Sequence, residues 1–109
     1  MDLSVTEHAA VTTVMGKLSR ESGVAYRATS KTHGRLIVAR LRDGVTEPEL
    51  RAVIAYCASP KTEGGKGWRG DPKMHEFLRP ETLFGPEAIE RYLAPARTWA
   101  AELLARGPT

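Results

Sequence analysis

Apolar residues recur at the three-to-four-residue spacing of a helix in four stretches of the chain, and no stretch shows the sustained alternation of a strand. The stripes are Val11, Val14, Met15 and Leu18; Ile37, Val38 and Leu41; Leu50, Val53, Ile54 and Cys57; and Ile89, Tyr92, Leu93, Ala96, Trp99 or Ala100, and Leu103. The pattern predicts an all-α fold. We expect a small single-domain bundle of four to five helices over residues 1–109, with an ordered irregular segment before the last helix.

The third helix has the clearest start. Thr46 followed three residues later by Glu49 is the pattern of a capping box, and Pro48 fits the first turn. Weaker start and stop signals flank the other stripes: Gly23, Ser30 or Thr32, Gly44, and Ser59 with Pro60. Pro95 lies inside the last stripe, where a proline is expected to kink the helix or split it in two.

The segment over residues 71–85 carries dense local signals. Asp71 before Pro72 indicates an N-cap with proline at the first helical position. Pro80 then disfavours helix at Arg79, which ends the first turn, and a second short turn is predicted over residues 81–84. The apolar residues Met74, Phe77, Leu78, Leu83 and Phe84 predict that this segment docks onto the helices. The glycine-rich stretch before it, residues 59–70, is expected to be flexible.

Length and composition narrow the class of protein. The 109 residues suffice for one hydrophobic core, and no stretch approaches the roughly 20 apolar residues needed to span a bilayer. With no signal peptide at its start and a single cysteine, the chain is expected in a reducing cytosol. Residues 27–79 hold eleven basic and six acidic side chains, whereas the flanks are slightly acidic. A basic centre suits a polyanionic partner, and also an ordinary solvated surface.

No catalytic or metal-binding motif is visible. His8, His33 and His75 lack a partner at ligand spacing, and the glycines of residues 64–67 do not match a phosphate-binding loop. Cys57 shares the apolar stripe of its helix, which predicts a buried core thiol; a thiol–imidazole pair with His33 or His75 is the alternative. We therefore expect a protein that is not an enzyme and that uses no cofactor and no metal.

Two groups of cations are candidates for phosphate contact. On one helix, Lys31, Arg35 and Arg42 project to the same side, next to the apolar stripe. A solvated helix face explains the same pattern equally well.

The second group follows the third helix. Lys61, Lys66, Arg69 and Lys73 surround Trp68. Cations interleaved with an aromatic ring are what a single-strand binder uses, because the cations follow the backbone while the ring stacks on a base. The alternative is that Trp68 packs onto the core and holds the loop in place.

One set of residues recurs together in a known family. The set is Tyr26 with Arg27, the run from Leu36 to Thr46, Trp68, the run from Asp71 to Met74, the run from Leu78 to Gly85, and Tyr92 with Leu93. Through these residues the chain resembles, over about residues 14–93, the conserved phage C-terminal domain of replisome-organiser and DnaD-like helicase-loader proteins, which implies the bacterial host cytoplasm as its location. The eight residues from Leu78 to Gly85 are the most specific part.

The resemblance implies an all-helical domain that acts in phage DNA replication as a replication accessory, by binding DNA, the host replicative helicase, or both. We expect DNA, single-stranded and with little sequence preference, to contact Lys31, Arg35, Arg42, Lys66, Trp68, Arg69 and Lys73. A protein partner is expected at Phe77, Arg79 and Phe84. The alternative function is a protein-interaction module that binds or inhibits a host protein without contacting DNA.

Overall fold

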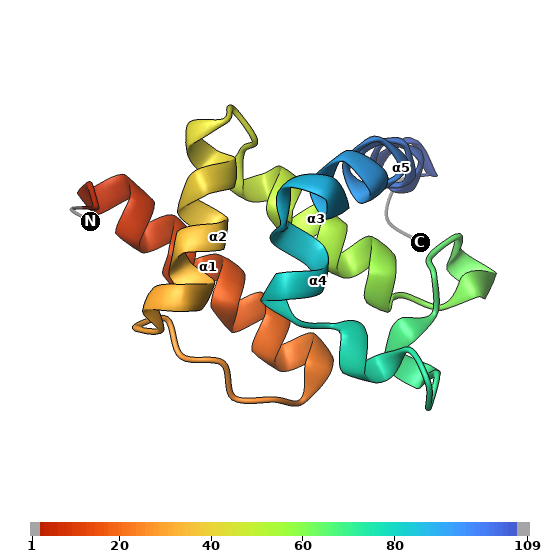
Figure 1. The fold of residues 1–109 in the computed structure, drawn as a ribbon. Coiled ribbons are helices and arrows are strands. Elements are labelled where there is room, and N and C mark those ends of the chain that lie inside the picture. Colours follow the sequence, from red (N-terminus) through yellow and green to blue (C-terminus); the bar gives the residue numbers. More distant parts are fainter. Residues whose placement is uncertain (1–2, 107–109) are drawn as a thin grey trace.

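The computed structural model describes residues 3–106, which form α-helices joined by turns (Figure 1). The α-helices are α1 (Val5–Ser22), α2 (Lys31–Arg42), α3 (Glu47–Ala58), α4 (Pro80–Phe84) and α5 (Pro86–Arg106). Three 3₁₀ turns, η1 (Lys61–Glu63), η2 (Trp68–Gly70) and η3 (His75–Phe77), lie between α3 and α4. This range contains no strand, and the predicted all-α class with five helices is confirmed.

The helix starts follow from local hydrogen bonding. At α3, the Thr46 side chain accepts from the Glu49 backbone while the Glu49 carboxylate accepts from the Thr46 N–H, as the capping box predicts. Ser30 caps α2. A second capping box, between Ser4 and Glu7, starts α1. It was not predicted, although the same spacing of a hydroxyl and a glutamate marks it in the sequence.

Helix α5 continues as one α-helix through Pro95, so the predicted split is wrong. At the end of α1, Gly23 adopts a left-handed conformation with φ of 75°, which confirms it as the stop signal. None of the helices within residues 3–106 combines the length and the apolar character that a membrane crossing requires.

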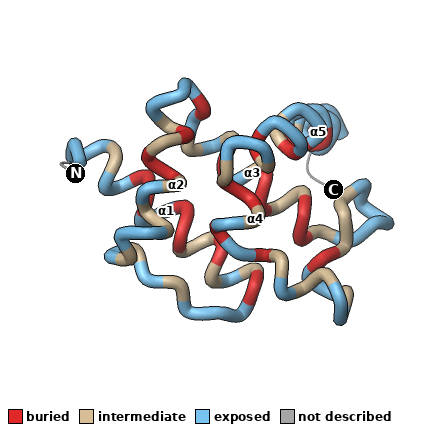
Figure 2. Tube along the Cα trace, viewed as in Figure 1, coloured by how far each residue is buried: buried red, intermediate tan, exposed pale blue. Residues whose placement is uncertain are grey.

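Helix α3 is the centre of the core. It packs against α1 on one side and α5 on the other, while α2 packs against α4. The largest fully buried side chains come from α1, α2, α3 and the segment before α5; they are Phe84, Met15, Leu18, Ile37, Leu50, Ile54, Leu78 and Leu83. Figure 2 shows buried positions interspersed with exposed ones along the helices, as expected where one side of each helix faces the core.

The segment over residues 71–85 docks onto the helices as predicted, but its first half is not an α-helix. Leu78, Leu83 and Phe84 are fully buried, and Phe77 is half-buried against the core. The Asp71 carboxylate accepts from two backbone N–H groups that follow it, as expected of an N-cap. Helix does not propagate beyond one turn because Pro80 holds the residue before it extended; the chain forms η3 instead, and α4 begins at Pro80.

Candidate nucleic-acid interface

The glycine-rich stretch after α3 is fixed to the end of that helix. The Lys66 backbone N–H donates to the carbonyl of Tyr56 at 2.9 Å, and the Gly67 N–H donates to the carbonyl of Ser59 at 2.7 Å. Carbonyls in the last turn of a helix have no partner within the helix, so the returning chain satisfies them. The backbone expected to be flexible is therefore hydrogen-bonded in place, and the cations it carries have defined positions.

Glycines are required in this loop for two different reasons. Gly64 and Gly67 adopt positive φ angles of 85° and 73°. A Cβ on Gly65 would lie 2.3 Å from the backbone oxygen of Ser59, closer than any side chain tolerates. Trp99 of α5 also contacts the loop, because its indole N–H donates to the Glu63 carbonyl at 2.8 Å.

Trp68 is buried, with 4% of its surface exposed. Its ring meets Tyr92 edge-on at 5.7 Å and Phe77 at 6.4 Å between ring centroids, and the Lys66 ammonium lies 5.7 Å from its centroid. The packing interpretation of Trp68 is therefore the one that describes the structure. Its predicted stacking on a nucleic-acid base is corrected, because no face of the ring is open to a ligand.

We call Lys61, Lys66, Arg69 and Lys73 the loop cations. Lys61 and Arg69 line a hollow of about 400 Å³ together with Gly67 and Gly70. Arg69 also forms an ion pair with Glu21 at 2.8 Å. Lys61 and Lys73 form no direct ion pair in the described part of the chain, and their charges act on the nearby carboxylate of Asp71.

Asp71 reflects the positive potential in this region. Backbone N–H groups of Lys73 and Met74 lower the pKa of its carboxyl, and the charges of Lys61 and Lys73 lower the pKa further. Both lysines are thus close enough to one anion of the protein to stabilise it. Glu63 and Asp71 are the acidic residues within residues 59–74, so this segment keeps a positive balance.

The cations of α2 lie elsewhere. Figure 1 shows α2 and residues 61–73 at opposite sides of the molecule, so the two groups do not form one surface. Lys31 and Arg35 line a cleft between α2 and α1. Arg42 forms two hydrogen bonds to the carboxylate of Glu7, at 2.8 and 3.1 Å. The six predicted cationic contacts are therefore divided between α2 and the segment after α3, with three in each. The seventh predicted contact, Trp68, is buried.

The residues expected to meet a protein partner are largely used inside the molecule. Phe84 is fully buried, which corrects its assignment to a partner surface. Phe77 is half-buried, and the Arg79 guanidinium lies 5.2 Å from its ring centroid. Arg79 is exposed, and its Nε donates to the Thr82 hydroxyl at 3.0 Å.

Arg40 has a structural role that the sequence pattern did not indicate. It is buried, donates to the backbone carbonyl of Phe84 at 3.1 Å, and pairs with Asp43 at 3.1 Å. Phe84 ends α4, where a cation is favourable to the unpaired carbonyls. A buried arginine at this position joins α2 to the junction of α4 and α5, and no local pattern distinguishes it from the exposed arginines around it.

Cys57 is fully buried, as predicted, and burial raises the pKa of its thiol to about 12. At neutral pH the thiol is protonated and is a poor nucleophile. Within residues 3–106, no three His, Cys, Asp or Glu side chains come together in a way that could hold a metal ion.

Comparison with known proteins gives one family. The model of the "Conserved phage C-terminus" family matches residues 14–94 of the chain. No curated protein and no solved structure matches it. The matched range runs from the middle of α1 into α5. It contains the glycine-rich stretch of residues 59–70 and the segment of residues 71–85. The chain belongs to the conserved phage C-terminus family.

Proposed function

We propose that the protein is a non-enzymatic accessory of phage DNA replication, which binds single-stranded DNA through the loop cations and works beside the replicative helicase. The resemblance to replisome-organiser and DnaD-like helicase-loader proteins supports the replication context. The buried, protonated thiol of Cys57 supports a role without nucleophilic catalysis.

The observation that carries the DNA half of the proposal is the fixed placement of the loop cations. Flexible lysines on a disordered loop would lose conformational freedom on binding, whereas this backbone is already hydrogen-bonded to the end of α3. The hollow between Lys61 and Arg69 gives a phosphate a concave site with two cationic walls. Because Trp68 offers no stacking face, affinity comes from phosphates and sequence preference is weak.

Fluorescence anisotropy with a labelled oligothymidine strand tests this proposal. Four phosphate contacts predict a slope of about −2.8 in log K against log salt, so a fourfold rise from about 50 mM should weaken binding roughly 50-fold. Lys61→Ala/Lys66→Ala/Lys73→Ala should lower the affinity at low salt and flatten the slope. A matched triple, Lys17→Ala/Arg91→Ala/Arg106→Ala, removes the same charge elsewhere and should bind nearly as the parent does. Absence of binding at low salt, or equal losses in the two triples, would refute the interface.

The alternative function, a protein-interaction module, loses Phe84 from the surface first expected for it, since that side chain is buried. Of the other two residues, Phe77 is half-buried and Arg79 is exposed.

A further inference from the structure

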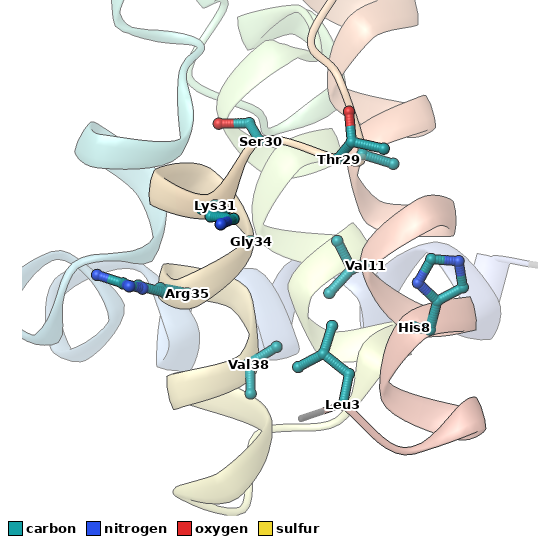
Figure 3. Close-up of a pocket in the computed structure, with 10 residues that line it drawn as sticks. Leu3, His8, Val11, Thr29, Ser30, Lys31, Gly34, Arg35 and Val38 are labelled. Carbon is teal, nitrogen blue, oxygen red and sulfur yellow. The ribbon is translucent and has the colours of Figure 1, made fainter. Parts of the chain in front are cut away.

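A cleft of about 310 Å³ lies between the start of α1 and the first half of α2. Figure 3 shows Val11, Val38 and Leu3 pointing into the space between the two helices. Val11 and Val38 form a buried apolar floor, while Leu3 is 38% exposed at the open end. The aliphatic part of the lining is of the kind that holds an apolar side chain, and the rest is polar, from His8, Thr29, Ser30, Lys31 and Arg35.

Helix α2 carries a glycine beside the cleft where its fold does not need one. Gly34 lies inside the helix, and its φ is not in the left-handed region. A Cβ at this position would meet only Val11, at the ordinary contact distance of 3.9 Å. Glycine destabilises a helix interior by about 1 kcal/mol relative to alanine. Neither backbone strain nor crowding explains the residue, whereas the space left by its missing side chain is part of the cleft.

The rim of the cleft is basic. Lys31 and Arg35 line it from α2 and His8 from α1, and none of its lining residues is acidic. Figure 3 shows Arg35 extending outward from α2, on the side away from α1, where its charge reaches the surroundings of the cleft rather than its floor. Lys31 and Arg35 form no ion pair within residues 3–106. The nearest carboxylate along α1, that of Glu7, is held by Arg42.

We propose that the α1–α2 cleft docks an acidic segment of a protein partner, which places one large apolar side chain against Leu3 and over Gly34 and sets a carboxylate against Lys31. The volume is at the low end of the range of ligand pockets and accommodates one or two side chains. An apolar floor favours a peptide over the phosphate backbone of a nucleic acid, because phosphates gain nothing from aliphatic contact.

This inference does not rest on the DNA proposal. The cleft and the loop cations lie at opposite sides of the molecule, so each can fail separately.

The test uses a fluorescein-labelled peptide with a central phenylalanine flanked by aspartate and glutamate, followed by anisotropy and by ¹H–¹⁵N NMR of the whole chain. Binding should shift the amides of Val11, Gly34 and Val38 and leave those of Lys66 and Gly67 in place. A peptide with alanine at the centre should bind at least about tenfold more weakly, as expected for loss of a buried aromatic ring. A peptide with lysine flanks should not bind.

Three variants separate the cleft from a general effect of charge or folding. Gly34→Leu fills the cleft and should abolish binding, whereas Gly16→Leu introduces the same side chain in α1, beside the flexible Arg20, and should not. Lys31→Glu/Arg35→Glu should reduce binding by at least about tenfold through reversed charge. If the Gly34→Leu protein is misfolded by circular dichroism, Gly34→Ala serves instead, with a smaller loss.

Lys61→Ala/Lys66→Ala/Lys73→Ala should retain peptide binding whether or not it binds DNA. Equal binding of acidic and lysine-flanked peptides would overturn the proposal. So would amide shifts in the cleft on addition of oligothymidine but not of peptide, which would assign this face to nucleic acid.

Discussion

At Trp68, the burial of one side chain excludes the stacking of a ligand on its ring. Because its ring is packed between Tyr92 and Phe77, Trp68→Ala should leave a cavity and lower the free energy of unfolding by about 3–5 kcal/mol. Urea denaturation followed by circular dichroism measures this. Leu104→Ala is the control, since Leu104 is 83% exposed and its loss should change stability by less than about 0.5 kcal/mol. A Trp68→Ala protein as stable as its parent would contradict the packing.

Glu7 gives the molecule a response to acid. Its carboxylate binds Arg42, and it accepts from the Ser4 N–H; together these contacts lower its pKa from 4.5 to about 2. A pKa lowered by folding means that the stabilising effect is complete above pH 4.5 and is lost as the pH falls toward 2. Glu7→Gln should therefore show a smaller fall in Tm over this interval than the parent does. The effect is expected to be small because the pair is exposed, and thermal melts across the pH series at fixed ionic strength measure it. Parallel curves for the two proteins would exclude the assignment.

At the scale of elements, the loop after α3 depends on Gly65. Gly65→Ala forces a Cβ against the Ser59 carbonyl and should destabilise the protein by about 1–3 kcal/mol, as overpacking does. Gly70→Ala is a close control: it lies in the same segment, a Cβ added to it would meet nothing within 4 Å, and its φ is not left-handed. Chemical denaturation of both variants checks the contrast, and equal stabilities would show that the loop can shift to accommodate the methyl group.

The elements that the sequence predicted best are those set by neighbouring residues. Thr46 and Glu49 bond to each other's backbone, and Asp71 caps the turn that follows it, so their spacing was informative. The expectation for residues 59–70 was misleading because glycines by themselves indicate a flexible loop. The sequence does not show that backbone N–H groups of this stretch donate to carbonyls at the end of α3. The burial of Arg40 could not be predicted, and that of Trp68 was one of two alternatives, since both depend on segments far away in the chain. Spacing likewise could not show that the cations of α2 and those of the loop face different ways.

At the scale of the whole molecule, the two groups of cations should act independently. The longest extent of the molecule is 41 Å, and at physiological salt the Debye length is about 8 Å, so charges at one side contribute little at the other. Lys31→Glu/Arg35→Glu should therefore change affinity for oligothymidine by less than about threefold, while Lys61→Glu/Lys73→Glu should reduce it much further. Anisotropy titrations at physiological salt compare the two pairs. A larger loss from the α2 pair would place the nucleic acid on α2.

The hydrogen bond that joins the two ends of the loop after α3 also determines where the chain can change in length. The Gly65 N–H donates to the Pro60 carbonyl at 3.1 Å, so residues 61–64 form a small lobe whose two ends are already joined. Insertions within residues 61–64 leave the hydrogen bond between Gly65 and Pro60 and the core unchanged. Doubling the length of a loop adds only about 0.6 kcal/mol of closure entropy. Changes in the length and charge of residues 61–64 can therefore leave the rest of the fold as it is.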